Sequence, residues 1–152
     1  MGSLWLIFYR MFSKEESKNI REEFWTGFGK EYSRKWILYD TKMKELQLKF
    51  SFDNSIARVS MDISSRDALI RAYYFEKITA LKTILLDNYL PDATFEESFL
   101  LPEGKTISSV FVELENVNIH NKKDWPGVHK FFYDKMSLME EFFLEYESYI
   151  ND

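Results

Sequence analysis

Cysteine is absent from this sequence of 152 residues, and histidine occurs only twice, as His120 and His129. Without cysteine the chain cannot form disulfides, thiolate metal sites or a thiol nucleophile. The two histidines have no paired spacing of the kind that binds a metal, and no serine lies in a nucleophile-elbow motif. The sequence therefore predicts no metal site, no cofactor and no catalytic residue of these types. The lack of cysteine also fits a reducing compartment, so we predict a cytoplasmic protein.

Glycine and proline are scarce, with five and three residues, and no stretch approaches the roughly 20 apolar residues of a membrane span. We therefore expect neither a long flexible linker nor membrane insertion. In residues 1–12, bulky apolar residues precede any helix signal. Three interpretations compete: an extra strand at a sheet edge, an aggregation-prone tail, or an upstream start before a natural start at Met11. We treat 1–12 as an N-terminal extension and 13–152 as one domain.

Aromatic residues, by contrast, make up 18% of the chain, which favours a well-packed interior. The net charge of −5 disfavours binding to bulk nucleic acid, because neutralising phosphates requires clustered lysine and arginine. One segment, 30–49, is locally basic, and it predicts a possible contact surface for nucleic acid. Its candidate residues are Lys30, Arg34, Lys35, Lys42 and Lys44.

The clearest folding signal is the segment 45–63, in which apolar and polar residues alternate strictly on both sides of Asp53-Asn54. Such alternation is typical of strands with one buried face. A two-residue turn at Asp53-Asn54, with the positive φ that these residues tolerate, predicts a hairpin. Its predicted partners are Phe52 with Ser55, Phe50 with Ala57, Leu48 with Val59, and Leu46 with Met61.

The other face of this hairpin is polar and carries Glu45, Gln47, Lys49, Arg58, Ser60 and Asp62. In the predicted register Glu45 lies opposite Asp62, and Lys49 lies opposite Arg58, so like charges would oppose each other at a cost. Folding alone does not explain such an arrangement. We therefore predict a binding site at Glu45, Lys49, Arg58 and Asp62, with a merely solvated charged face as the structural alternative.

The remaining elements are predicted from periodicity and capping signals. A capping box at Ser13 starts a helix that ends near residue 30. A short strand over 35–39 precedes the central hairpin, a helix over 66–89 follows it, and a last helix begins at 121–124 and ends near residue 150.

A second hairpin is predicted between the last two helices, from strands 94–101 and 107–115. Phe95 and Phe99 are expected to face one way on its first strand, and Val110, Val112 and Leu114 on its second. The complete order is α-β-β-β-α-β-β-α. The predicted fold class is α+β, with one mostly antiparallel sheet of about five strands and three helices packed on one face.

One catalytic alternative remains. Asp40 followed by Gln47-Leu48-Lys49 faintly resembles the motif of PD-(D/E)xK nucleases, in which acidic residues hold Mg²⁺ and the lysine orients water or stabilises charge. However, Gln47 replaces the usual acid, and the motif falls one strand too early for that fold. We therefore predict no catalytic residues, and keep Asp40, Gln47 and Lys49 as the alternative for a degenerate nuclease-like domain.

Two of the predicted helices carry aromatic residues outside their main apolar stripes, at Tyr73, Phe75, Phe131, Phe142 and Tyr149. These side chains either widen the core or form an interface with a protein partner. Because the helices are long enough to leave spare apolar surface, we predict a protein partner or a homodimer.

Several short segments of the sequence are distinctive. They are Arg21-Glu-Glu-Phe-Trp-Thr-Gly-Phe-Gly, Arg34-Lys-Trp-Ile-Leu-Tyr-Asp-Thr-Lys, Tyr74-Phe-Glu-Lys-Ile, Leu90-Pro-Asp-Ala and Phe142-Phe-Leu-Glu-Tyr-Glu. From about Met11 onward the chain resembles the bacterial family called domain of unknown function 4268. The resemblance implies a domain that occurs alone or behind a nuclease-like domain, and so a role beside nucleic-acid processing. It carries over no catalytic residues. Together these observations predict a non-enzymatic binding or interaction domain.

Overall fold

The computed structural model describes the backbone of residues 2–152 and the side chains of residues 14–152. The elements are α1 (Gly2–Glu31), β1 (Leu46–Phe52), β2 (Ile56–Ile63), α2 (Ala68–Ala80), α3 (Lys82–Asn88), β3 (Thr94–Leu100), β4 (Thr106–Glu115), the 3₁₀ helix η1 (Lys122–Asp124) and α4 (Trp125–Ile150). The strands form one antiparallel sheet in the order β1-β2-β4-β3. The α+β class is therefore confirmed. The predicted counts are wrong, because the described residues form four strands and four α-helices.

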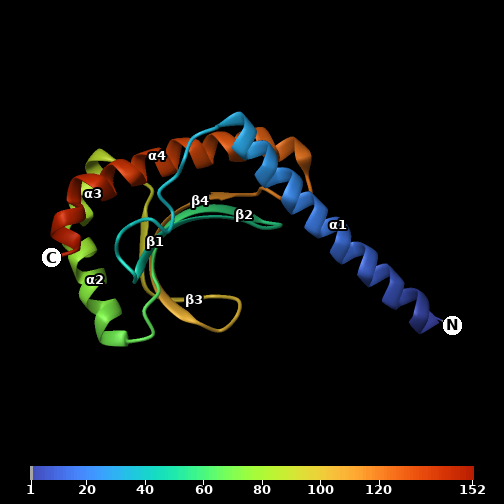
Figure 1. The fold of residues 1–152 in the computed structure, drawn as a ribbon, viewed down its shortest axis with the longest axis horizontal. Coiled ribbons are helices and arrows are strands. Elements are labelled where there is room, and N and C mark those ends of the chain that lie inside the picture. The colour runs from blue at the N-terminus through green and yellow to red at the C-terminus, as the bar shows by residue number, and fades with distance from the viewer. Residues whose placement is uncertain (1) are drawn as a thin grey trace.

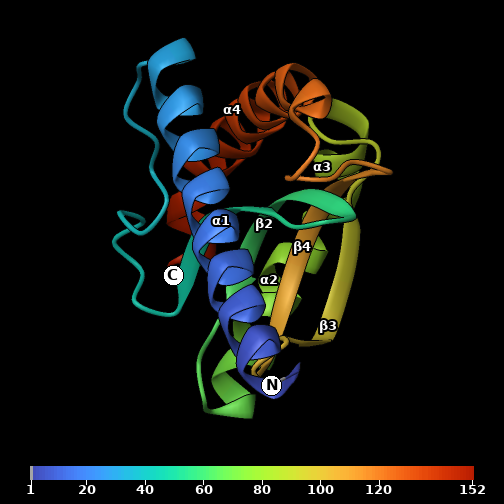
Figure 2. The same cartoon turned by 90° about the vertical axis from the view of Figure 1, so that its right-hand side faces the viewer.

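The sheet is curved, and the helices lie on its convex side (Figure 1). Helix α4 runs along that side, with α2 and α3 at one end, while the C-terminal half of α1 packs near the start of α4. The N-terminal half of α1 extends away from the sheet (Figure 1). Figure 2 views the sheet from the concave side, with β2, β4 and β3 side by side and α1 crossing in front of part of β2. None of the described helices combines the length and apolar character that spanning a membrane requires.

The core lies between the convex face of the sheet and α4. Alternate residues of β1, β2 and β4 point into it, as the sequence pattern predicts, including Val110 and Val112 on one face. Fully burying one such side chain contributes about 1.5–3 kcal/mol, so this face dominates the stability of the fold. The principal core residues are Leu46, Leu48, Val59, Met61 and Ile63 from the sheet and Phe132, Met136, Met139 and Phe143 from α4.

The central hairpin forms, but its register differs from the prediction. Phe52 pairs with Ala57 and Leu46 with Ile63, so every partner is two residues further along the chain. The turn has moved by one residue because Asp53 closes it: its carboxylate accepts hydrogen bonds from the backbone N–H groups of Ser55 and Ile56, both at 2.8 Å. The positive φ expected of the turn is absent. A shift of two keeps each side chain on its face, so the alternation holds in either register.

The second hairpin, β3–β4, is confirmed, but Phe95 and Phe99 do not face one way. A β-bulge between Glu96 and Phe99 shifts the pairing, so that Phe95 lies opposite Val110 and Phe99 opposite Ile107. Successive residues of β4 alternate between faces, which puts Phe95 on the convex side and Phe99 on the concave side. The bulge therefore brings an aromatic ring onto the polar face.

The predicted strand at 35–39 is wrong, because this segment is a loop. The carboxylate of Glu140, on α4, pairs with Arg34 and accepts a hydrogen bond from the backbone N–H of Ile37 at 2.7 Å. Leu38 has a φ of 47°, which is incompatible with an extended strand. Glu140 is only 4% exposed, so a buried carboxylate attaches this loop to the helix.

Two helix boundaries also differ from the prediction. Helix α1 continues without a break through Ser13, so the helix does not begin at Ser13 and residues 2–12 are helical rather than a strand; the side chains of 1–13 lie outside the described ones. The predicted helix over 66–89 is divided at Leu81 into α2 and α3. Of the aromatic residues considered for an interface, Phe75 and Phe142 are buried in the core.

Candidate binding site on the concave sheet face

A cavity of about 420 Å³ opens on the concave face beside the β3–β4 turn; we call it the hairpin cavity. Its polar floor comes from three strands and consists of Lys49, Ser51, Arg58, Ser60, Asp62 and Ser109. Its lip comes mostly from the β3–β4 hairpin and includes Phe99, Leu101, Pro102, Glu103 and Ile107. The site therefore combines a polar base with a mainly apolar rim.

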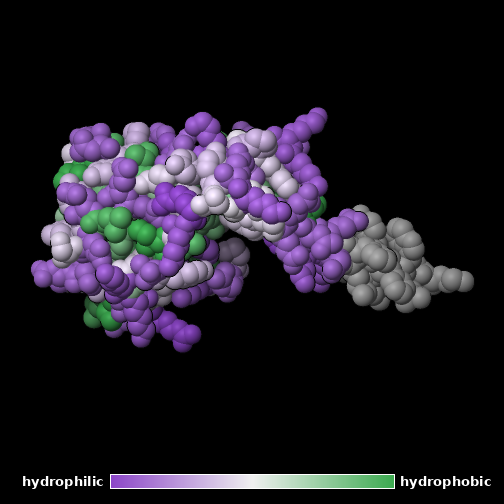
Figure 3. All heavy atoms as spheres, turned by 45° about the horizontal axis from the view of Figure 1, so that its top comes forward, coloured by the Kyte–Doolittle hydropathy of each residue, from purple (hydrophilic) through white to green (hydrophobic). Residues whose placement is uncertain are grey.

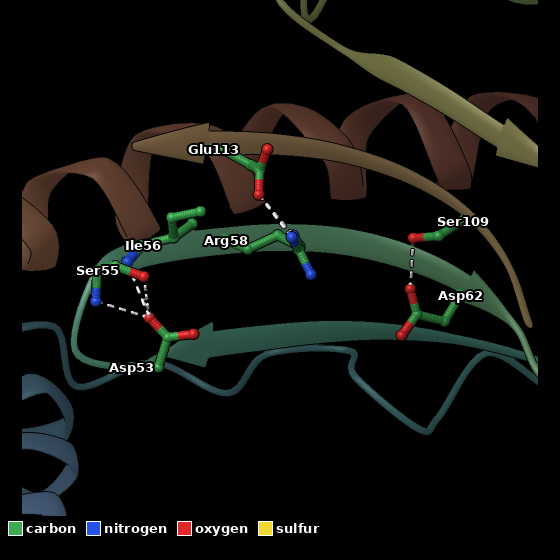
Figure 4. A network of polar contacts seen from close by, with 7 residues as sticks. All are labelled: Asp53, Ser55, Ile56, Arg58, Asp62, Ser109 and Glu113. Carbon is green, nitrogen blue, oxygen red and sulfur yellow. Dashed lines mark hydrogen bonds and ion pairs between the residues drawn. The ribbon is translucent and has the colours of Figure 1, made fainter. Parts of the chain in front are cut away.

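Strand order brings the polar side chains together. Strand β2 pairs with β4 as well as β1, which places Glu113 directly opposite Arg58 and Ser109 directly opposite Asp62. Figure 4 looks onto this polar face, with α4 on the far side of the sheet. Both cross-strand pairs form polar contacts. Strand β4 thus provides partners for Arg58 and Asp62 that β1 does not provide.

Arg58 is held in a fixed orientation. Its Nε and Nη2 atoms donate to one carboxylate oxygen of Glu113 at 3.2 and 2.5 Å, and its guanidinium carbon lies 4.7 and 4.8 Å from the ring centres of Phe99 and Phe111. The third nitrogen, Nη1, points away from Glu113 toward β1 (Figure 4). Two aromatic rings and one carboxylate therefore position a guanidinium with one donor nitrogen left over.

Asp62 is the buried acid of this face, at 4% exposed. Burial raises the pKa of its carboxyl, although hydrogen bonds from Ser109 and Ser60 and the charges of Lys49 and Arg58 act in the opposite direction. The Ser109 hydroxyl donates to it at 2.7 Å. Asp62 therefore binds a proton more readily than an exposed aspartate does.

Asp53, at the edge of the cavity, behaves in the opposite way. Burial acts to raise the pKa of its carboxyl, but hydrogen bonds from Ser55 and Ile56 outweigh burial and the pKa is lowered. Its charge is thus stabilised by the turn that it closes. Lys49 forms no ion pair with any side chain that the structure describes.

One protein family matches the sequence, the domain of unknown function (DUF4268), over residues 20–147. The chain belongs to this family. The match spans the whole sheet, so the hairpin cavity lies inside the DUF4268 domain, and the resemblance seen in the short sequence segments is confirmed. No curated protein and no solved structure matches the chain.

The DUF4268 fold brings together three of the four predicted binding residues. Lys49, Arg58 and Asp62 line the hairpin cavity, whereas Glu45 lines a separate hollow with Lys105 at the start of α2. The expected opposition of like charges is wrong. In the observed register Gln47 pairs with Asp62, Lys49 with Ser60, and Ser51 with Arg58.

The alternative nuclease residues do not share the cavity. Lys49 lines it, Gln47 lies on the same polar face outside the lining, and Asp40 is exposed in the loop before β1. In the part of the chain that the structure describes, no three His, Asp or Glu side chains are placed to hold a metal ion. The nuclease interpretation stays a prediction, and Mg²⁺-dependent cleavage of DNA or RNA, lost in Lys49→Ala, is its test.

The predicted basic residues are distributed over different surroundings. Arg34 pairs with Glu140 and lies over the ring of Trp36, with 3.8 Å from the guanidinium carbon to the ring centre. Lys30 lines a hollow on α1 that also contains Glu22 and Glu23, and Lys44 lines the hollow of Glu45. Lys35 and Lys42 are exposed.

Sequence reasoning missed the contribution of the second hairpin to the site. Ser109, Phe111 and Glu113 alternate with the buried valines of β4, so their position on one face was readable from the sequence. The sequence did not indicate which strand these three residues would lie beside. Phe99 could be assigned to this face only once the β-bulge was known.

Proposed function

We propose that this DUF4268 domain is a non-enzymatic binding domain and that the hairpin cavity is its binding site. The observation that supports this proposal is a pair of cationic groups on the cavity floor without acceptors: the ammonium of Lys49 and the Nη1 atom of Arg58. Neither group takes part in a hydrogen bond or ion pair at these atoms within the described residues. Cationic donors left facing a cavity are available to a ligand.

The chemistry of the floor favours binding over catalysis. The floor hydroxyls in contact with a possible base are those of Ser109 and Ser60, which both hydrogen-bond to Asp62. An aspartate carboxylate is a weak base toward a serine hydroxyl, and serine nucleophiles are more commonly paired with histidine or a neutral lysine. The Ser109 contact instead orients the Asp62 carboxyl and satisfies one of its oxygens.

The proposed setting is a cytoplasmic one beside nucleic-acid processing. Its support is the family resemblance, in which the domain occurs alone or behind a nuclease-like domain. A partner that contacts nucleic acid directly would use the exposed Lys42 and Lys44 rather than Arg34, which is already paired with Glu140. Binding to an RNA or DNA duplex that weakens steeply between 50 and 200 mM salt would support direct contact, as expected of phosphate neutralisation.

We further propose that a protein partner or a second copy covers the end of the molecule formed by α2 and the end of α4. Leu69 is 81% exposed there, and Tyr73 and Tyr149 are also exposed. Hydrophobic residues gather over this end of the surface in Figure 3. A solution mass twice that of the monomer, returning to monomer in Leu69→Glu, would support a homodimer, and a wild-type monomer at micromolar concentration would contradict it.

The binding proposal is tested by thermal unfolding in a heat-cleared small-molecule extract of bacterial cells. A ligand that binds only the native state raises the unfolding temperature. We expect the extract to raise the unfolding temperature of the wild type and not that of Lys49→Ala.

The matched control is Lys35→Ala, which removes a lysine charge from an exposed loop outside the cavity. It should respond to the extract as the wild type does. No shift in the wild type, or equal shifts in Lys49→Ala and Lys35→Ala, would contradict the proposal that the hairpin cavity is the binding site.

A further inference from the structure

The hairpin cavity also indicates the chemical class of its ligand. We propose that it binds a small organic anion in which one phosphate or carboxylate group is joined to an apolar, preferably aromatic, body. This inference rests on the proposed function, because it requires the cavity to be a binding site. It goes further by naming what the site selects.

The first argument is the balance of available charge. Lys49 and the Nη1 atom of Arg58 face the cavity without acceptors. Among the acids, Asp53 uses a carboxylate oxygen to close the β1–β2 turn, and Asp62 accepts from Ser109. Glu103 remains, but it is exposed on the β3–β4 turn at the rim. The two cationic donors therefore have no acceptor, whereas Asp53 and Asp62 each have one carboxylate oxygen engaged in hydrogen bonds, which favours an acceptor group on the ligand.

The second argument is the geometry of Arg58. Its guanidinium is fixed by Glu113 and by the rings of Phe99 and Phe111. A guanidinium held in place loses little conformational entropy when it forms another hydrogen bond. The Lys49 ammonium is a flexible point charge on the neighbouring strand, in register with Ser60. One fixed donor and one mobile cation, with serine hydroxyls between them, suit a single oxyanion head group.

The third argument is the apolar rim. The β-bulge turns Phe99 onto this face, and Leu101, Pro102 and Ile107 line the cavity beside it. Ile107 is already buried, but an anion without an apolar part would leave Phe99, Leu101 and Pro102 in contact with water, whereas a ring packed on them removes apolar surface from water. The rim therefore favours a ligand with a hydrophobic or aromatic body.

The fourth argument is size and overall charge. A cavity of about 420 Å³ lies at the lower end of the roughly 300–1,000 Å³ that is usual for small-molecule sites. A polymer would have to continue onto the surrounding surface of a domain whose net charge is −5, where it would meet electrostatic repulsion if it were a nucleic acid. A small anion avoids this repulsion.

The experiment is isothermal titration calorimetry on the full chain at about 50 mM salt, a concentration at which electrostatic binding is strong. Phenyl phosphate and 3-phenylpropionate distinguish phosphate from carboxylate as the head group. Inorganic phosphate supplies the head alone, benzyl alcohol the body alone, and phenethylamine the opposite charge. We expect at least one aromatic anion to bind about tenfold more tightly than the head or the body alone, which corresponds to about 1.4 kcal/mol.

The variants locate the binding. Lys49→Ala should weaken the aromatic anion about tenfold, as expected for loss of one charge-assisted contact, whereas Lys49→Arg should restore most of the affinity. Lys35→Ala should leave it within about twofold, because an exposed charge outside the cavity is screened by salt.

Three outcomes would overturn the inference. They are no binding of either aromatic anion at millimolar concentration, equal or tighter binding of phenethylamine, and preferential, steeply salt-dependent binding of a single-stranded oligonucleotide. A phenethylamine complex that Lys49→Ala alters would overturn the ligand class while leaving the binding proposal intact. Equal responses of Lys49→Ala and Lys35→Ala to the cell extract would remove both.

Discussion

The two faces of the sheet are made by the same strands, yet their side chains find interaction partners in different ways. On the convex face the strands bury their apolar side chains in the core, and one buried polar group on this side, Glu140, is engaged through both carboxylate oxygens by Arg34 and the backbone of Ile37. The concave face points away from α4, and its polar side chains satisfy one another only in part (Figure 4). Lys49 and one nitrogen of Arg58 remain without acceptors.

This difference separates stability from function. A buried group with all of its partners contributes to folding and has nothing left to offer a ligand. A group that is held in place but has only some of its hydrogen-bond partners lowers the stability of the fold and is available for binding. Substitutions on the convex face should therefore change stability, and those on the concave face should change binding.

The largest expected effect tests neighbouring residues of β1 that point to opposite faces. Leu48 is 1% exposed on the convex face, and Leu48→Ala should lower the free energy of unfolding by about 3 kcal/mol through lost burial and the cavity left behind. Lys49→Ala should change it by less than about 1 kcal/mol. Urea denaturation measures both. Equal losses would contradict the division between the faces.

The next effect concerns the buried acid of the convex side. Glu140→Leu removes the partner of Arg34 and of the Ile37 N–H, and should cost about 2–3 kcal/mol, less than for a fully buried pair because Arg34 is partly exposed. Glu141→Leu, at the next, exposed position of α4, is the control and should stay within about 0.5 kcal/mol. If Glu140→Leu leaves the free energy of unfolding unchanged, contacts other than those of Glu140 hold the loop of residues 33–45 in place.

A smaller effect is expected for the ion pair of the concave face. Arg58 and Glu113 are each about one quarter exposed, at 24% and 25%, so solvent screens their attraction. Glu113→Gln should cost about 0.5–1 kcal/mol, as partly exposed pairs do. The substitution should also free the Arg58 guanidinium to move, so the free energy of binding an aromatic anion should change by more than the free energy of unfolding does. An unchanged affinity would contradict a positioning role for Glu113.

The smallest effect is a dependence on pH. The pKa of Asp62 in the folded state is raised above its ordinary value of 3.8. Its contribution to the free energy of unfolding is therefore complete below pH 3.8 and is lost as the pH rises through the folded-state pKa. Asp62→Asn cannot ionise and should gain stability relative to the wild type at pH 7, with the gain shrinking as the pH falls toward 4.

Asp53→Asn is the matched control for this prediction, with the opposite sign. The pKa of Asp53 is lowered, so its contribution is present above the ordinary value and is lost as the pH falls. Asp53→Asn should therefore lose stability relative to the wild type at pH 7, and the loss should shrink on acidification. Thermal unfolding between pH 4 and 7 measures both variants. Equal slopes would show that neither carboxyl is shifted.

Much of the candidate site was predictable from the central hairpin alone. The alternation in 45–63 placed Lys49, Arg58 and Asp62 on one face, and they do line one cavity. Glu45, which directly precedes β1, instead lines the hollow at the start of α2. The partners of the charges could not be predicted, because β4 is separated from β2 by more than 40 residues of sequence.

The sequence by itself determined which residues face the core, where the main helices lie, and that the fold is α+β. These properties follow from local periodicity, which a chain carries in any tertiary context. Only the tertiary structure decided the turn position, the pairing of β2 with β4, and the bulge that turns Phe99 onto the concave face. A period of two is unchanged by a shift of two residues, and strand order depends on contacts between distant segments. The hairpin cavity arises from those decisions.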